Sequence, residues 1–199
     1  MHKPEIILDE NHRYTVDGFP VMGVSEIIAD NGFGISEKVP QRVLEVASKF
    51  GSFTHKATQL HDLKTLDKAT LSSEIEAYLN GWIKFREDFG FDPSAIELRG
   101  YSKIHNYCFT LDRAGLIKKG LYAGEMAVVD IKTSTGIQKS TAIQLDGYMI
   151  GYNESWKPRA TKGLSVQLLP DDYKVQFNEP HDTGIFIACA RLSNWRKIK

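Results

Sequence analysis

The fold of this chain is decided by three consecutive segments, YCFTLDRAG (107–115), GEMAVVDIKTS (124–134) and STAIQLDGY (140–148). The first predicts an apolar strand that ends in Asp112. The second predicts an apolar strand that ends in Asp130-Ile131-Lys132. The third predicts a helix that carries Gln144 and Tyr148, one helical turn apart. Two strands and a helix with polar side chains at their ends form the centre around which we expect the rest to fold.

Side-chain alternation fixes how the second strand presents its charges. Successive side chains of a strand point to opposite faces, so Asp130 and Lys132 lie on one face and Ile131 on the other. Because Val128, Val129 and Ile131 make both faces apolar, we expect a central, buried strand. A carboxylate and an ammonium group at the end of a buried strand are unfavourable unless they serve a purpose there.

The remaining segments predict a mixed α/β fold. We expect short N-terminal strands around a turn at Asp17-Gly18, then helices, three strands, a helix, a hairpin around Pro170-Asp171-Asp172 and a closing helix. The helices are predicted over 25–30, from Pro40 to about residue 60, over 73–89 and over 182–195, and the strand before 107 over 95–101. Two apolar stripes are expected to face the core: Val43, Val46, Ala47, Phe50, Phe53, Ala57 and Leu60 in the second helix, and Phe186, Ile187, Ala190 and Trp195 in the last.

Composition indicates an ordinary globular chain. Its 199 residues suggest a single domain over residues 1–199, and 42% hydrophobic and 25% charged residues are typical values. The formal net charge is +0, so a nucleic-acid partner would need a local basic surface. We find neither an apolar run of about 18 residues nor a signal-peptide pattern. Cys108 and Cys189 lie in apolar runs and are expected to be buried thiols, so we expect a cytoplasmic protein.

The two strand-end carboxylates indicate metal chemistry when they are taken together. Asp112 alone is explained by turn chemistry, and Asp130 with Lys132 by a surface ion pair. Two carboxylates that converge on one site repel each other unless a cation lies between them. Mg²⁺ accepts one or two carboxylates together with waters and a substrate phosphate. Lys132 could then orient the attacking water or offset charge on the phosphate.

Three further residues are candidates on weaker grounds. His55 lies off the apolar stripe of its helix, and although a lone helical histidine is commonly a surface residue, its small neighbours Gly51 and Ser52 would allow a close approach. Gln144 and Tyr148 are either an ordinary polar helix edge or a pair that binds a phosphate and a nucleotide.

In order and context, these motifs resemble the RecB-type exonuclease branch of the PD-(D/E)xK nuclease superfamily. That branch combines a helical G-x-x-x-H with an Asp, then D/E-x-K-T and Q-x-x-x-Y. Here the matching residues are Gly51 to His55, Asp112, 130–133 and Gln144 to Tyr148. The opening hairpin and the closing helix look like phage and prophage members, so the resemblance covers nearly the whole chain. Two departures are a missing Pro of the superfamily name and Phe109, where many members have Gly.

The resemblance implies specific roles for these residues. The fold would be a restriction-endonuclease-like core, a mixed central β-sheet flanked by helices. His55, Asp112, Asp130 and the carbonyl of Ile131 would hold Mg²⁺ or Mn²⁺, with Lys132 catalytic. Glu97 is either a catalytic residue at a second metal or a surface charge at the edge of a strand. Gln144 and Tyr148 would position DNA, and five cations would line one side of the cleft: Arg113, Lys118, Lys119, Lys132 and Lys139.

The function that this resemblance implies is a metal-dependent DNA exonuclease of recombination, repair or replication. An endonuclease of the same superfamily is the alternative, although such enzymes usually lack the His55 and Gln144/Tyr148 elements. A nonhydrolytic DNA-binding module is the third reading, but such a module would be expected to have lost Lys132 or an Asp. DNA is the expected partner, with a single-strand annealing or single-strand binding protein as a second one. An oligomer is compatible with this reading, and a membrane partner is not expected.

Overall fold

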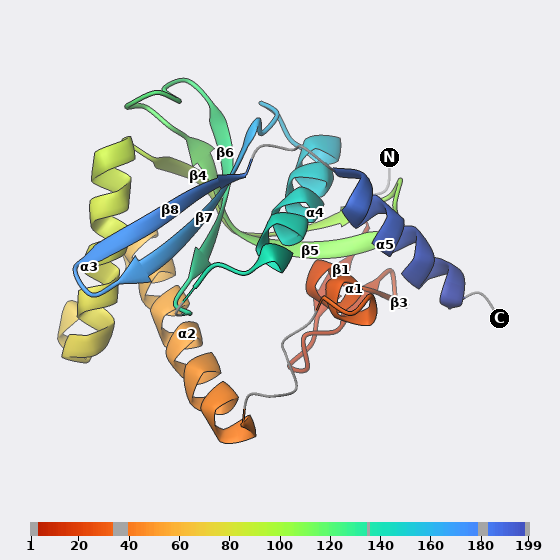
Figure 1. Ribbon diagram of the computed structural model, residues 1–199, viewed down its shortest axis with the longest axis horizontal. Coiled ribbons are helices and arrows are strands. Elements are labelled where there is room, and N and C mark those ends of the chain that lie inside the picture. Colours follow the sequence, from red (N-terminus) through yellow and green to blue (C-terminus); the bar gives the residue numbers. More distant parts are fainter. Residues whose placement is uncertain (1–3, 34–39, 135, 179–182, 198–199) are drawn as a thin grey trace.

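The computed structural model describes residues 4–33, 40–134, 136–178 and 183–197, which form a mixed α/β fold with two sheets (Figure 1). The larger sheet has five strands in the order β4-β5-β6-β7-β8, and the smaller is an antiparallel sheet of β1, β2 and β3. The strands of the larger sheet are β4 (Asp92–Ser102), β5 (Tyr107–Leu116), β6 (Met126–Lys132), β7 (Lys162–Leu169) and β8 (Asp172–Asn178). Those of the smaller sheet are β1 (Ile6–Leu8), β2 (Tyr14–Val16) and β3 (Phe19–Val21).

Helices cover both faces of the larger sheet. In Figure 1 α3 lies at one side of the sheet and α4 at the other, next to α5. The helices are α1 (Val24–Asp30), α2 (Gln41–Asp62), α3 (Ser73–Phe89), α4 (Lys139–Ser155) and α5 (Thr183–Arg196), with a short 3₁₀ turn at Lys68–Thr70. The predicted order of elements is confirmed. Asp182, the expected first residue of the last helix, lies outside the described residues.

The crossover from β6 to β7 makes the sheet mixed. These two strands are parallel and are joined through α4, whereas the other three pairings are antiparallel. A parallel pair needs a long connection, and here α4 supplies it while packing on the sheet. As a result, the loop from Lys132 to Lys139 lies at the edge where the charged end of β6 emerges. This edge is where the polar residues gather.

The alternation predicted for β6 is confirmed by two separate hydrophobic cores. Val128 packs in the core beneath α4, with Leu145 and Met149 of that helix. Val129 and Ile131 pack in the other core, with Trp82 of α3. Cores on both faces explain why the strand is apolar on both sides.

The expected end of β5 at Asp112 is wrong. The strand continues to Leu116, and Ala114 and Gly115 pair with both β4 and β6. The Gly that suggested a turn serves a different purpose, since a Cβ at Gly115 would clash with the backbone of Asp92 in the neighbouring strand. Gly115 permits β4 and β5 to approach each other closely. At this point the register of β4 shifts between Pro93 and Ala95, as in a β-bulge. Asp112 therefore lies within the strand.

Two expected core stripes are only partly buried. In α2, Ala57 is buried, but Val43, Val46 and Phe53 are 55%, 63% and 66% exposed, because the first half of this helix extends beyond the sheet (Figure 1). In α5, Phe186 and Ala190 are fully buried, whereas Trp195, near the end of the helix, is 69% exposed. Helical periodicity identifies an apolar face but not whether a partner reaches it.

Phe109 of β5 fits between two glycines. Its ring lies where a Cβ at Gly100 of β4 or at Gly151 of α4 would clash with it. The ring is fully buried and also contacts Tyr148 and Trp156, with ring centroids 6.4 Å and 6.1 Å away. These contacts hold α4 against β5 directly beside Asp112.

The small sheet is attached to β5. Gly23 forms a parallel bridge with Cys108, and the Cys108 amide donates a hydrogen bond of 2.9 Å to the Met22 carbonyl. Tyr14 reaches the same strand, with its hydroxyl 2.8 Å from that of Thr110. Cys108 and Cys189 are both buried and free, as expected. Within the described residues, no helix has the length and hydropathy needed to cross a membrane.

Candidate active site

The candidate site lies where β5 and β6 stop pairing. Their backbone register runs from Leu116↔Met126 to Arg113↔Val129, and the next residue of β5 is Asp112. Beyond this point a side chain replaces the backbone as the hydrogen-bond acceptor between the two strands: Asp112 Oδ2 accepts a hydrogen bond of 2.6 Å from the Ile131 amide. The separation of the two strands places the Asp112 and Asp130 carboxylates in one opening.

This opening is a cavity of about 230 Å³ that collects most of the predicted site. Its lining comes from four elements: α2, β5, the end of β6 with the loop after it, and α4. The lining residues are His55, Asp112, Asp130, Ile131, Lys132, Thr133, Ser134, Gln144 and Tyr148. Seven residues that the motifs predict for metal binding, catalysis or DNA positioning therefore line one cavity. Glu97, the weaker candidate, lies beside this cavity.

A chain of hydrogen bonds crosses the cavity from β6 to α4. Lys132 Nζ lies 3.1 Å from Asp130 Oδ1 and donates to Gln144 Oε1 over 2.9 Å. Gln144 Nε2 then donates to the Tyr148 hydroxyl over 2.7 Å. Since the Gln144 side chain is oriented at both ends, α4 holds the Lys132 ammonium group beside the carboxylates. The i,i+4 spacing seen in the sequence produces this link.

His55 reaches the site from the last third of α2. Its Nδ1 lies 3.4 Å from Asp112 Oδ1, and its side chain is 31% exposed. Burial alone would lower the pKa of His55, but the neighbouring Asp112 carboxylate outweighs burial and raises it to about 9. The same pairing holds the pKa of Asp112 below its usual range, although burial opposes this. Without a bound metal, His55 is thus a cation that neutralises Asp112.

Glu97 joins these two residues in a possible ligand set. One ligand atom each of His55, Glu97 and Asp112 lies within 4.8 Å of the others. Glu97 has φ of 50°, a left-handed conformation that is unusual for a non-glycine residue inside a strand. Burial and the Asp112 carboxylate raise the pKa of Glu97. Strained residues that present a charge to such a cluster are typical of functional sites.

The Asp130 carboxylate is the least satisfied group of the site. Burial, reinforced by the nearby Asp112 carboxylate, raises its pKa to about 6 despite the Lys132 ammonium group. Asp130 Oδ2 is buried and accepts no hydrogen bond within the described part of the chain, although Lys132 Nζ lies 2.9 Å from it at a poor angle. A buried carboxylate oxygen with this deficit fits a hard cation, and the carboxylate and carbonyl oxygens of the site suit Mg²⁺ or Mn²⁺.

Comparison with known proteins identifies no family for this chain. No protein-family model matches it, and no curated protein is significantly similar to it. Several solved structures are similar to it, and one of them is described as SSO0001, at 16% identity and a TM-score of 0.38, covering 87% of this chain and 84% of that one. A likeness at that level carries no functional conclusion, which has to come from the site itself.

The expectation that five cations line one side of the cleft is wrong for Arg113. Its side chain is fully buried on the opposite face of the sheet from Asp112, where it lies 5.7 Å from the Trp82 ring centroid. It donates to Asp62 over 2.6 Å and to Glu97 over 3.1 Å. Alternation accounts for the difference, since consecutive residues Asp112 and Arg113 must face opposite ways.

Lys118 and Lys119 also lie away from the cavity. Both amides bind the Phe89 carbonyl at the end of α3, and their ammonium groups bind Asp92 and the Glu87 carbonyl over 2.7 Å each. This is the end of the sheet where β6 begins, and the six residue steps to Lys132 span about 20 Å. Lys139, the exposed first residue of α4, remains near the loop that leaves the cavity.

The buried partner of Arg113 was not recognised in the sequence. Asp62 accepts hydrogen bonds from Arg113, Arg86 and Trp82, and the side chains of Asp62 and Arg113 are both fully buried. Thr58 of α2 also accepts one from Arg113 over 3.1 Å. Asp62 follows His55 by seven residues, two turns of the same helix, and this spacing is the available sequence signal. The network fixes the C-terminal end of α2, and with it His55.

Proposed function

We propose that this protein is a metal-dependent DNA nuclease, most consistent with an exonuclease of the RecB type on a restriction-endonuclease-like core. The observation that carries the proposal is the buried Asp112–Asp130 pair with Lys132 at the point where two strands separate. His55 and the Gln144–Tyr148 pair around it favour the exonuclease over other members of the superfamily. The mixed sheet with helices on both faces is compatible with such a core.

In this proposal Asp112, Asp130 and His55 hold the metal, with Glu97 next to them. A bound Mg²⁺ or Mn²⁺ supplies a Lewis acid for the scissile phosphate and lowers the pKa of an attacking water. Lys132, held by Asp130 and Gln144, places a positive charge where negative charge grows on the phosphate. Tyr148 keeps its proton, because burial raises its pKa well above the usual value, and so it acts as a hydrogen-bond donor or a surface for packing.

Digestion of labelled DNA tests this proposal directly. Linear and circular DNA of the same sequence are incubated with the protein in Mg²⁺ and in EDTA. An exonuclease is expected to degrade only the linear DNA and only in Mg²⁺. Cleavage of the circle would favour the endonuclease alternative. Absence of cleavage of both forms in Mg²⁺ and in Mn²⁺ would overturn the nuclease assignment.

His55 is expected to control metal affinity more than DNA affinity. Replacement His55→Ala removes one ligand and the group that neutralises Asp112, so we expect the Mg²⁺ needed for half-maximal activity to rise by roughly 10- to 100-fold. Mn²⁺ should restore activity better than Mg²⁺, because Mg²⁺ demands near-ideal octahedral geometry and is more sensitive to the loss of one ligand.

Metal titrations of the two proteins, and DNA affinity measured in Ca²⁺, check this expectation. His61→Ala, in the same helix and half-buried outside the cavity, is the matched control and should leave the metal titration unchanged. An unchanged titration for His55→Ala would remove His55 from the ligand set.

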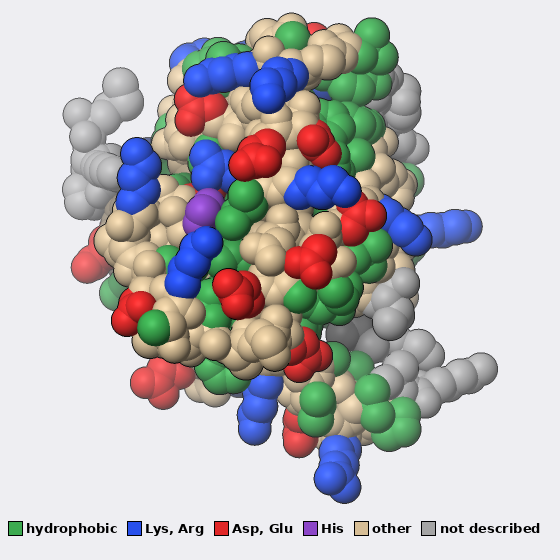
Figure 2. Space-filling model, turned by 90° about the vertical axis from the view of Figure 1, so that its left-hand side faces the viewer, with side chains coloured by type: hydrophobic (Ala, Val, Ile, Leu, Met, Phe, Trp, Pro, Cys, Tyr) green, Lys and Arg blue, Asp and Glu red, His purple; other side chains and the backbone are tan. Residues whose placement is uncertain are grey.

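DNA binding is expected to depend on local cations, since positive and negative side chains are interspersed on the face shown in Figure 2, seen from the side of α3. Lys139 begins the helix that lines the cavity, so Lys139→Glu should weaken DNA binding in Ca²⁺. The slope of the logarithm of the affinity against the logarithm of the salt concentration should become shallower by about one. Lys118→Glu, about 20 Å from Lys132 along the sheet, should change neither. Fluorescence anisotropy over a range of salt concentrations measures both slopes, and equal effects of the two variants would place DNA elsewhere.

A further inference from the structure

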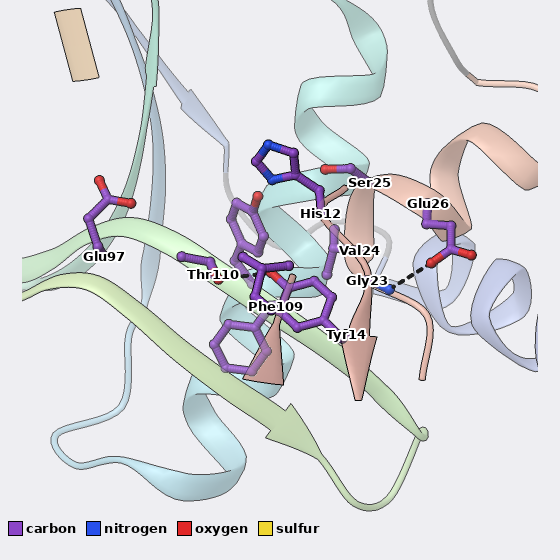
Figure 3. A pocket seen from close by; sticks show the side chains of 11 residues that line it. His12, Tyr14, Gly23, Val24, Ser25, Glu26, Glu97, Phe109 and Thr110 are labelled. Atoms are coloured by element: carbon purple, nitrogen blue, oxygen red, sulfur yellow. Dashed lines mark hydrogen bonds between the residues drawn. The ribbon is translucent and has the colours of Figure 1, made fainter. Parts of the chain in front are cut away.

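A second cavity lies next to the active-site cavity and shares a wall with it. It encloses about 330 Å³ between the β1–β2 hairpin, the start of α1 and strands β4 and β5. Figure 3 shows it with Glu97 on one side, Glu26 on the other and His12, Ser25, Thr110 and Tyr14 between them. Tyr148 lines both cavities, and Glu97 lines this one while also belonging to the cluster with His55 and Asp112. The two cavities are therefore adjacent, with Tyr148 and Glu97 at the boundary between them.

The walls of the second cavity combine aromatic and aliphatic surface with a few polar groups. Tyr14 and Leu8 are the half-buried members, whereas Phe109, Tyr148 and Val24 are buried behind the wall and leave little of their surface open. The hydroxyl groups of Tyr14 and Thr110 lie 2.8 Å apart at the wall, and Ser25 adds a third hydroxyl. A small apolar cavity with a few oriented polar groups is typical of a site for one compact, flat molecule.

The charged residues of this cavity disfavour a phosphate. Among the described residues that line it, none is a lysine or arginine, and one histidine, His12, stands beside two carboxylates, Glu26 and Glu97. Glu26 is partly satisfied by the Gly23 amide at 3.4 Å, and Glu97 by Arg113 at 3.1 Å. An anionic group would be repelled here, while a neutral group with N–H donors would be accepted. The two neighbouring cavities thus differ in kind, one suited to a cation and a phosphate, the other to a neutral ring.

We propose that the second cavity binds the unpaired base of the nucleotide whose phosphate lies in the active-site cavity. This inference rests on the proposed nuclease function and adds a base-binding site to it. Aromatic side chains bind unstacked bases irrespective of sequence, because every base has a π face. A base has to leave its pair before it can enter a protein cavity, so the inference favours a single strand or a frayed end as the substrate.

Gly23 sets the width of the cavity. A Cβ on Gly23 would come within 2.7 Å of Tyr14 Cε2, so only glycine lets the Tyr14 ring lie where it does. Ser25, two residues later, is exposed and lines the cavity. A large side chain at Ser25 would therefore fill the cavity without disturbing the core. Ala29, one turn later in α1, is exposed and does not line it, which makes it the matched control.

Binding of two small phosphates tests the proposal without any cleavage. The affinities of deoxyadenosine 5′-monophosphate and of 2-deoxyribose 5-phosphate are measured by calorimetry in Ca²⁺ for wild type, Ser25→Trp and Ala29→Trp. We expect the nucleotide to bind about tenfold more tightly or better in wild type and in Ala29→Trp, and the difference to disappear in Ser25→Trp. Equal affinities in wild type, a difference that survives in Ser25→Trp, or no measurable binding of either compound would overturn the proposal.

A cleavage experiment separates failure of this inference from failure of the proposed function. Single-stranded DNA with a normal or an abasic terminal nucleotide is digested in Mg²⁺. If both ends are removed at the same rate, the protein is a nuclease but the base-binding site is wrong. If no DNA is cleaved while the nucleotide still binds more tightly than the sugar phosphate, the cavity binds a base and the nuclease proposal fails. Slower removal of the abasic end by wild type, but not by Ser25→Trp, supports both.

Discussion

Replacement of Lys132, Asp112 or Asp130 by Ala is expected to reduce the rate of DNA cleavage by at least about 100-fold. All three side chains line one cavity, where Lys132 is bound to Asp130, and Asp112 to the Ile131 amide and His55, so removing one disturbs the charge that the others balance. Loss of a group that stabilises charge at the reacting phosphate typically lowers the rate by about 10²–10³-fold. Single-turnover cleavage of an end-labelled oligonucleotide measures the effect.

Folding has to be separated from chemistry in these variants. Lys132→Ala should lose little stability, since burial already raises the pKa of Asp130 to about 6 and this carboxyl can take up a proton when the ammonium group is removed. Lys174→Ala, an exposed residue of β8, is the control that should leave both cleavage and stability unchanged. Wild-type cleavage by a folded Lys132→Ala protein would contradict the assignment of the site.

Replacement Arg113→Met is expected to cause the largest loss of stability of any single substitution considered for this protein. It removes the cation that binds Asp62 over 2.6 Å, Glu97 over 3.1 Å and Thr58 over 3.1 Å, in a fully buried location. Breaking a buried ion pair from one side costs about 3–5 kcal/mol, because it leaves an uncompensated charge. For a domain of ordinary stability this is a large fraction of the free energy of unfolding.

Urea unfolding of single and double variants checks this prediction. If the loss of stability comes from the unpaired Asp62 carboxylate, the double variant Asp62→Leu/Arg113→Met should lose less free energy of unfolding than the two single variants lose in sum. Lys84→Met, which breaks an exposed ion pair with Asp172, should have little measurable effect. Additive effects of Asp62→Leu and Arg113→Met would show that the pair does not act as a unit.

The sequence was sufficient to predict the order of elements and the meeting of the motifs. Periodicity and turn residues identify β6, α4 and the β7–β8 hairpin with nearly the observed bounds, because each buries a face that its pattern marks. Asp112, Asp130, Lys132 and Gln144 converge because consecutive strands and a crossover helix share one end of the sheet. Local patterns predict that these distant residues converge only because the strands that carry them are neighbours in the sheet and are followed by a single crossover helix.

Other features required the three-dimensional arrangement. The place where β5 and β6 separate, and with it the side-chain bond from Asp112 to Ile131, leaves no mark in either strand's own pattern. The direction of Arg113 follows from alternation with Asp112, yet its partner Asp62 lies 51 residues earlier in the chain. The second cavity is built from five separate segments, and its members, Ser25 and Thr110 among them, are individually ordinary. Packing between distant segments is what sequence patterns do not encode.

The fit of Phe109 between Gly100 and Gly151 couples these three positions sterically, so we expect substitutions at them to be linked in evolution. Alanine at either glycine is excluded while the Phe109 ring fills the space, and a smaller residue at 109 leaves a void that either position could fill. In a lineage that moves between these two states, substitutions at the three positions should appear together. Comparing the residue volumes at positions 100, 109 and 151 across homologues would therefore show on which branch of a phylogenetic tree the large residue at position 109 was gained or lost.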